Sequence, residues 1–137
     1  MKASGKNISS SKKLAKDNVS GQTRDIASDL SRLGSFDEIL EYLITYVTQT
    51  LEAERGSLFL HDPAAHQLYT RVALGNLSRE IRIDEQSGVA GWVFMNAEAT
   101  IVNNPYKDER FNKEVDERTG YQTKSLICVP IFSTGDI

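Results

Sequence analysis

YKDERFNKEVDERTGYQTKSLICVPI, residues 106–131, joins a charged segment to an apolar run, and this junction decides the fold. The first half is dense in charge between Asp108 and Arg118. Its apolar exceptions, Phe111 and Val115, are four residues apart, which predicts one face of a short helix. A short polar helix directly before an apolar run is typical of a lid that covers a cavity.

The second half of the stretch predicts how that helix ends. Gly120 lies between Thr119 and Tyr121, and glycine tolerates the positive φ at which helices commonly end. Residues 125–132 are apolar and of strand length, which predicts a buried strand closed by a turn at residues 133–136. Charge, glycine hinge and strand together favour a flap over a cavity, Tyr106–Thr123, which we call the lid segment. They do not favour a reaction centre.

These residues resemble the corresponding segment of GAF domains in cyclic-nucleotide phosphodiesterases and cyanobacterial-type adenylate cyclases. RGSLFLHD (residues 55–62) resembles the family's first strand, and IDEQSGVAGWVFMNAEATIVNN (residues 83–104) resembles its glycine turn, short helix and next strand. The resemblance covers residues 35–137. It implies an α+β fold of the GAF (PAS-like) type, an antiparallel sheet flanked by helices. It also implies that the family's last strand and helix, with its NKFDE motif, would follow Ile137, so that the domain is truncated.

Composition divides the chain into three regions. Residues 1–22 are polar and predict a flexible basic segment, because residues 1–24 hold six Lys/Arg against one acid. Residues 23–34 predict a linker or dimerisation helix, and residues 35–137 the GAF domain. The basic segment has no aromatic residue to stack a base and the rest of the chain is acidic, so nucleic acid is not the expected partner.

Apolar spacing predicts the elements within these regions. Ile26, Leu30 and Leu33 form a narrow seam suited to helix pairing. Ser35 and Glu38 have the form of a capping box that opens a second helix. That helix carries an apolar stripe of Phe36, Ile39, Leu40, Leu43, Ile44, Val47 and Leu51. Further along, we expect strands at 55–61, 67–74, 80–83 and 100–102, a turn at 63–66 and a helix at 88–95.

The sequence offers little for catalysis. His61 and His66 have no second metal ligand at a regular spacing, and we interpret them as solvated loop residues. Cys128 is the single cysteine, lies in an apolar run and is expected to be a buried, inert thiol. There is no phosphate-binding P-loop, nucleophile elbow or metal motif. No apolar run reaches membrane-spanning length, and the lone thiol suits a reducing cytoplasm.

The first candidate ligand site is the start of the predicted helix at residue 88. Ser87 followed by small residues exposes N–H groups at the positive end of a helix, which suits an anion. The resemblance implies that the backbone amides of Val89 and Ala90 hold a cyclic phosphate. The alternative is an ordinary capped helix that packs Trp92 and Val93 into the core.

Two further sets of residues match ligand positions of the family. The resemblance places Asp116, Thr119 and Thr123 against the base or ribose. The alternative is that Asp116 and Thr119 only terminate a helix and a turn.

The other set is Ser57, Ala73 and Leu74. In cGMP-binding members the positions of Ala73 and Leu74 carry an aromatic residue and an acid. Leucine cannot accept the guanine N–H bonds, so the pattern favours cAMP over cGMP. The alternative for Ser57 is a small strand residue packed beneath a helix.

The resulting hypothesis is a regulatory sensor of a signalling protein. A small-molecule ligand, a cyclic nucleotide, would order the lid segment and bias a homodimer formed by the N-terminal helices. An attached effector, an adenylate cyclase, a phosphodiesterase or a histidine kinase, would respond; no catalytic residue, metal or other cofactor is expected. One alternative is a ligand-free dimerisation module whose interior is filled by Leu74 and Trp92. Another is a tetrapyrrole or haem carrier.

Overall fold

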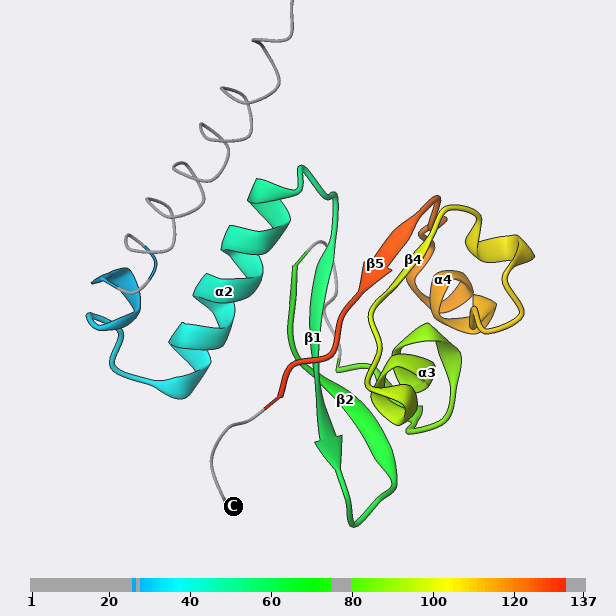
Figure 1. Cartoon of the computed structure of the whole chain (residues 1–137), viewed down its shortest axis with the longest axis horizontal. Helices are drawn as coiled ribbons and strands as arrows, with labels where there is room; N and C mark the ends of the chain where they lie inside the picture. The colour runs from blue at the N-terminus through cyan, green and yellow to red at the C-terminus, as the bar shows by residue number, and fades with distance from the viewer. Residues whose placement is uncertain (1–25, 27, 75–79, 133–137) are drawn as a thin grey trace, which may run out of the picture. The chain divides into compact units, whose positions relative to one another are not determined.

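The computed structural model describes residues 26, 28–74 and 80–132 (Figure 1). Helices and antiparallel strands are intermixed along the described residues, as expected for an α+β fold. The elements are α2 (Phe36–Thr50), β1 (Gly56–Asp62), β2 (Gln67–Leu74), β3 (Arg82–Asp84), α3 (Gly88–Asn96), β4 (Thr100–Val102), the 3₁₀ helix η1 (Pro105–Lys107), α4 (Lys113–Thr119) and β5 (Leu126–Cys128). The chain divides into two units, residues 1–43 and 44–137.

The first unit confirms the predicted capping box at the start of α2. The backbone N–H of Glu38 donates to Ser35 Oγ at 3.2 Å, and the N–H of Ser35 donates to Glu38 Oε2 at 3.1 Å. Among the described residues before α2, Ile26 and 28–30 are helical and Leu33 follows that helix. The predicted flexible segment, residues 1–22, lies outside the described residues.

Within the second unit, β1, β2 and β3 form one antiparallel sheet in that order. The turn predicted at residues 63–66 is present and closes the β1–β2 hairpin, with His66 at φ 54°. Asp62 Oδ1 accepts the N–H of Ala65 at 3.1 Å inside this turn. Leu58 on β1 and Leu68 on β2 are the buried apolar residues of the hairpin.

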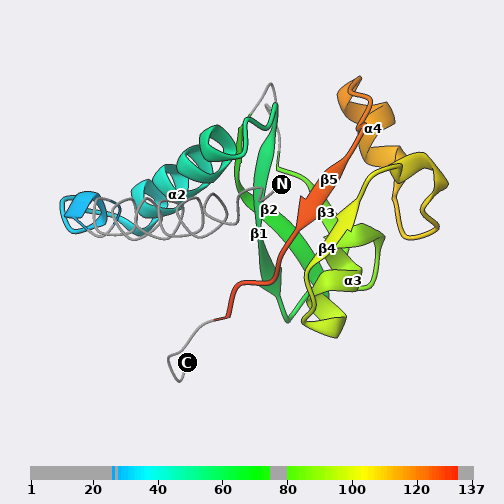
Figure 2. The same cartoon turned by 45° about the horizontal axis from the view of Figure 1, so that its top comes forward.

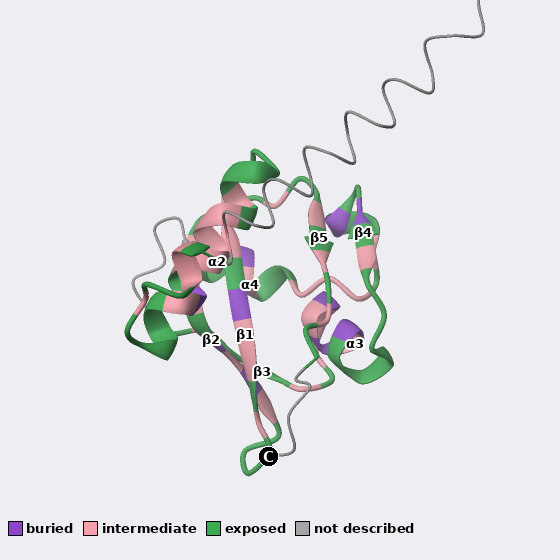
Figure 3. Cartoon of the chain, turned by 60° about the vertical axis from the view of Figure 1, so that its left-hand side comes forward, coloured by how far each residue is buried: buried purple, intermediate pink, exposed green. Residues whose placement is uncertain are grey.

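The second sheet, β4–β5, packs with α3 to form the apolar core of this unit (Figure 2). Val89, Val93 and Val102 are its buried centre, and Trp92, Phe111, Leu126 and Cys128 pack against them. Figure 3 shows buried residues on both α3 and β4. Gly91 lets α3 lie close to the loop that precedes it, because a Cβ there would lie 2.6 Å from the backbone carbonyl carbon of Gln86.

Two predictions about the stretch 106–131 are wrong. The helix does not run from Asp108; α4 begins at Lys113, capped by Asn112, whose Oδ1 accepts the N–H of Glu114 at 3.0 Å. Phe111 therefore precedes the helix and packs into the α3–β4 core, so it shares no helix face with Val115.

The predicted buried strand at 125–132 is also shorter than expected. Only Leu126–Cys128 pair with β4. The apolar residues that do not face α3 are exposed to solvent, with Ile127 56% and Ile131 77% exposed. The two-stranded sheet packs one face against α3, and alternate residues of each strand point to the opposite face, where no described element covers them. Pro130 adds a position that cannot donate a ladder hydrogen bond.

Candidate functional site

The start of α3 has the geometry of an open helix N-terminus. Ser87 is the N-cap residue in extended conformation, at φ −90° and ψ 142°, and its side chain makes no capping hydrogen bond. The N–H of Gly91 donates to the Ser87 carbonyl at 3.1 Å. The N–H groups of Val89 and Ala90 precede this first helical bond, so the helix itself supplies no acceptor for them. Val93 is buried in the core and Trp92 packs against it, as the alternative of an ordinary capped helix predicted, and Val89 joins the same core.

The lid segment meets α3 at this point. Gly88 has φ 72°, and a Cβ built there would lie 3.6 Å from Cβ of Asn112. Asn112 Nδ2 donates to Ser87 Oγ at 3.5 Å, while the same side chain caps α4. The starts of α3 and α4 are thus side by side, although 25 residues separate Ser87 from Asn112.

Asp116 is the buried carboxylate of the lid segment. It is 6% exposed, and it accepts hydrogen bonds from Tyr106 Oη at 2.8 Å, from the Thr123 N–H at 2.7 Å and from Thr123 Oγ1 at 2.7 Å. The bond to Asp116 raises the pKa of Tyr106. Two of the predicted ligand residues, Asp116 and Thr123, therefore lie together. Their third partner, Tyr106, was not predicted as a site residue; a carboxylate that packs inward demands donors, but the sequence does not identify them.

Thr119 does not join this cluster. Its Oγ1 donates to the Val115 carbonyl at 2.9 Å and lies 3.4 Å from the Asp116 carbonyl, so its hydroxyl bonds within α4. Gly120 then ends the helix at φ 65° and donates its N–H to the Asp116 carbonyl, which confirms the predicted glycine stop.

Tyr121 connects the end of the lid segment to the entrance of β1. Its hydroxyl donates to Glu54 Oε2 at 2.6 Å, and the guanidinium carbon of Arg55 lies 3.8 Å from its ring centroid. The bond to Glu54 raises the pKa of Tyr121. These contacts join residues 67 positions apart, and no local pattern in the sequence signals them.

The register of the hairpin places the third predicted set. Ser57 on β1 is the direct partner of Ala73 on β2, and Gly56 is the partner of Leu74. Ser57 is exposed and Ala73 is half-buried. Directly paired residues of neighbouring strands face the same side, so Ser57 and Ala73 share one face of the sheet.

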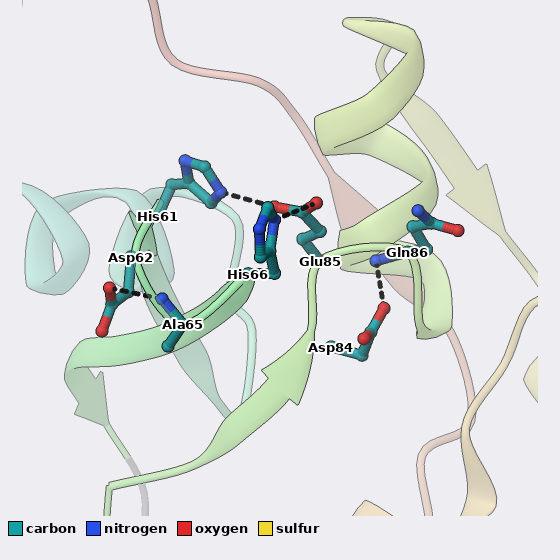
Figure 4. A network of polar contacts seen from close by, with 7 residues as sticks. All are labelled: His61, Asp62, Ala65, His66, Asp84, Glu85 and Gln86. Carbon is teal, nitrogen blue, oxygen red and sulfur yellow. Dashed lines mark hydrogen bonds and ion pairs between the residues drawn. The ribbon is translucent and has the colours of Figure 1, made fainter.

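His66 lies in the hairpin turn with a side chain that is 75% exposed, as predicted, whereas His61 lies within β1 with a side chain that is 30% exposed. Both rings contact Glu85, which was not predicted. His61 Nε2 lies 2.7 Å from Glu85 Oε2, and His66 Nδ1 lies 3.1 Å from Glu85 Oε1 (Figure 4). Hydrogen bonds from His61, and then from His66, lower the pKa of Glu85. The antiparallel hairpin brings both rings to the loop that precedes α3, a long-range pairing that ligand-spacing rules do not detect.

Asp108 and Arg110 form a partly buried ion pair in the lid segment. Arg110 binds Asp108 in bidentate fashion at 2.9 and 2.7 Å, and its guanidinium carbon lies 4.6 Å from the Trp92 ring centroid. The hydrogen bonds from Arg110 lower the pKa of Asp108 to about 2. The pair is partly buried because it lies over α3 rather than in open solvent.

The remaining chemistry is sparse. Burial raises the pKa of the Cys128 thiol, in line with the expected inert side chain. Within the described ranges, no group of three or more His, Cys, Asp or Glu side chains is arranged to hold a metal ion. None of the helices in that part of the chain combines the length and apolar character needed to cross a bilayer.

Comparison with protein families identifies the fold. The model of the GAF domain matches residues 35–137. This chain belongs to the GAF domain family. The predicted fold class and the resemblance on which it was based are confirmed.

The curated relatives of this GAF domain include cyclic phosphodiesterases. It is 36% identical to the "Probable 3',5'-cyclic phosphodiesterase pde-5" of Caenorhabditis elegans over 74% of this chain and 16% of that protein. It is 32% identical to a cGMP-specific 3',5'-cyclic phosphodiesterase of Drosophila pseudoobscura pseudoobscura over 83% of this chain and 11% of that protein. A dual 3',5'-cyclic-AMP and -GMP phosphodiesterase of Drosophila melanogaster is 32% identical over 83% of the chain and 9% of that protein. The chain thus spans less than a fifth of the length of each of these relatives.

Solved structures share the fold at low sequence identity. The GAF domain of a phosphoenolpyruvate-protein phosphotransferase from Coxiella burnetii has a TM-score of 0.73 at 17% identity, over 82% of this chain and 68% of that one. A free methionine-R-sulfoxide reductase from Neisseria meningitidis has a TM-score of 0.66 at 19% identity, over 80% and 62% of the two chains. These likenesses show the fold alone.

Proposed function

We propose that this GAF domain is a regulatory module that binds a cyclic nucleotide. The observation that carries the proposal is the meeting of the α3 start with the lid segment, where Asn112 lies beside Ser87 and Gly88. An anion at the Val89 and Ala90 amides would lie at the start of α3 and next to Asn112, which caps the start of α4. It would therefore contact both α3 and the lid segment. The phosphodiesterase relatives add support, since cyclic nucleotides are named in their activities.

In this proposal Asp116 and Thr123 contact the ligand, together with Thr119, Ser57, Ala73 and Leu74. Asp116 already accepts three hydrogen bonds from Tyr106 and Thr123. A ligand that supplies donors to Asp116 must therefore replace some of these bonds. Binding would reorganise the lid segment, and the population with a rearranged lid would carry the signal.

The proposal also concerns which cyclic nucleotide binds and which effector domain is attached. Ala73 and Leu74 favour cAMP by the argument given above, whereas the relatives are named for cGMP or for both nucleotides. For the attached effector, the relatives favour a phosphodiesterase over an adenylate cyclase. Dimerisation through residues 23–34 and a cytoplasmic location remain predictions.

The test is isothermal titration calorimetry of the chain with cAMP and cGMP, with 5'-AMP as a matched control that lacks the cyclic phosphate. We expect a saturable 1:1 heat with a cyclic nucleotide and a weaker one with 5'-AMP. Asp116→Ala and Thr123→Ala should each weaken binding, and Ala73→Phe with Leu74→Asp should shift the preference toward cGMP. No saturable heat with either cyclic nucleotide would refute the proposal.

A second candidate is a ligand-free dimerisation module. The observation in its favour is that the buried carboxylate of Asp116 is satisfied by groups of the same chain. Trp92 also packs against the α3–β4 core, as that alternative requires. The same titration separates the two, when combined with light scattering: a stable dimer without nucleotide heat would support this role.

A further inference from the structure

A cluster of His61, His66 and Glu85 includes none of the residues proposed to contact the ligand. His61 is on β1, His66 is in the hairpin turn, and Glu85 is in the loop between β3 and α3. Figure 4 shows the Glu85 side chain reaching toward both rings, so that each carboxylate oxygen has its own imidazole partner. One carboxylate therefore ties the tip of the hairpin to the loop that leads into α3.

Backbone contacts strengthen the same junction. The N–H of Glu85 donates to the His66 carbonyl at 3.0 Å, and Asp84 Oδ1 accepts the N–H of Gln86 at 2.9 Å. The loop cannot shift along α3 freely, because Gly91 lies against it; a Cβ at Gly91 would be 2.9 Å from the Glu85 carbonyl oxygen. A displacement of Glu85 would thus be transmitted to the first turn of α3.

A second contact joins the hairpin to α3 directly. The His61 ring lies 4.4 Å, centroid to centroid, from the ring of Phe94, at an interplanar angle of 36°. Phe94 is on α3, so His61 contacts the helix through one face and the preceding loop through Nε2. Both contacts fix α3 relative to the same two strands that carry Ser57 and Ala73.

We propose that the His61–Glu85–His66 cluster is a positioning clamp, which holds the start of α3, with the Val89 and Ala90 amides, in place against the β1–β2 hairpin. The clamp itself follows from the contacts above. Its consequence for ligand affinity rests on the proposed function, because the Val89 amide and the Ser57–Ala73 face must then act on one ligand. Glu85 is in this view a positioning residue and does not touch the ligand.

The first experiment needs no ligand. Amide hydrogen exchange of the chain is measured for wild type, Glu85→Ala and Glu80→Ala. Glu80 is a matched control, since it is a carboxylate bonded to Arg82 at 2.6 Å with no contact to the clamp. We expect faster exchange at residues 88–93 in Glu85→Ala only. Unchanged exchange there, or an equal change in Glu80→Ala, would overturn the clamp.

Glu85→Gln provides a rescue test. A glutamine amide can accept from one imidazole and donate to the other, so protection at residues 88–93 should largely return. If Glu85→Ala unfolds the chain, the double variant His61→Phe/His66→Ala decides, because it keeps a ring against Phe94 and removes both donors. Faster local exchange in that variant supports the clamp, and wild-type exchange overturns it.

The second experiment measures the dissociation constants of cAMP and cGMP. We expect Glu85→Ala to weaken binding by about two- to thirtyfold, the range of energetic coupling found for residues without ligand contact. Glu85→Gln should recover most of the loss, and Glu80→Ala should bind as wild type does. If wild type binds neither nucleotide, the proposed function fails while the exchange experiment still decides the clamp. If wild type binds and Glu85→Ala binds equally well, the affinity consequence is wrong.

Discussion

The α3–β4 core and the lid segment are neighbours in the fold, but different forces hold them. Val89, Val93 and Val102 are buried against one another, so their stabilisation comes from apolar surface removed from water. Apart from Phe111, which packs against this core, the lid segment is held mainly by directional polar bonds, those to Asp116 and the ion pair of Asp108 with Arg110. Hydrogen bonds can be exchanged for bonds to a ligand at small net cost, whereas a filled apolar core cannot be reopened cheaply. The proposed ligand response therefore concerns the lid segment and leaves the α3–β4 core in place.

Two glycines give the largest test of this contrast. Gly91→Ala should destabilise the fold by about 3 kcal/mol or more, because the added methyl would meet the backbone of Gln86 at 2.6 Å. Gly120→Ala in the lid segment adds the same methyl to open space at φ 65°, and should cost only about 1 kcal/mol of left-handed strain. Urea unfolding measures both free energies, and equal losses would contradict the division between core and lid.

Asp116 gives the next largest effect. Asp116→Ala should lower the free energy of unfolding by about 2 kcal/mol, since it leaves the Tyr106 hydroxyl and the Thr123 N–H without their acceptor. Hydrogen exchange should accelerate at residues 113–123 and remain slow at residues 89–93. Asp116→Asn retains one acceptor oxygen, so its free energy of unfolding should lie between those of wild type and Asp116→Ala. Uniform acceleration across both regions would show that the lid segment is not an independent unit.

Tyr121 gives a smaller effect. Tyr121→Phe removes the bond to Glu54 and keeps the aromatic face beneath Arg55, so we expect a loss of about 0.5–1 kcal/mol. The change should loosen the lid end more than α3, as judged by limited proteolysis near residue 120. Glu54→Gln is the matched variant, because its amide oxygen can still accept the tyrosine hydroxyl. A larger loss in Glu54→Gln than in Tyr121→Phe would contradict this account.

The narrowest effect concerns Asp108, which joins the lid segment to α3 through Arg110 and Trp92. The hydrogen bonds from Arg110 lower the pKa of Asp108 from 3.8 to about 2 in the folded chain. A lowered pKa means that folding favours the carboxylate, so this contribution is complete above the ordinary pKa and disappears as the pH falls through about 2. NMR titration of the Asp108 carboxyl should show this midpoint, and Arg110→Gln should return it toward the ordinary value. An unshifted midpoint in wild type would contradict the ion pair.

Local sequence signals predicted much of the fold correctly. Ser35 and Glu38 face each other across one helical turn, so a capping box can be recognised from four residues. Gly120 ends α4 at positive φ, as glycine does. The hairpin at residues 56–74 follows from two apolar runs and a short turn, and its pairing places Ser57 opposite Ala73. In each case the residues that interact are close in the sequence.

Predictions that required a distant partner were the ones that failed. Helical spacing predicted that Phe111 and Val115 share one face of a helix. In the structure Phe111 precedes α4 and packs against the α3–β4 core. Residues 129–132 were predicted to be part of a buried strand, but they are mostly exposed. Which apolar residues of a strand are buried depends on the element that packs against it, and the sequence of the strand does not show that element. His61 and His66 lacked a partner at any regular spacing, and their partner Glu85 is 24 and 19 residues away.

Residue preferences were enough to predict the capping box that opens α2, the glycine that ends α4 and the β1–β2 hairpin, and the quoted motifs were enough to predict GAF membership. The start of α4 and the length of β5 were not predicted, because packing around Phe111 and pairing with β4 set them. Only the tertiary structure decided that Asp116 meets Tyr106, that Tyr121 meets Glu54, and that one glutamate serves two histidines. The physical reason is that a side-chain hydrogen bond needs two groups within about 3 Å, and strand pairing and helix packing, not sequence spacing, create that proximity.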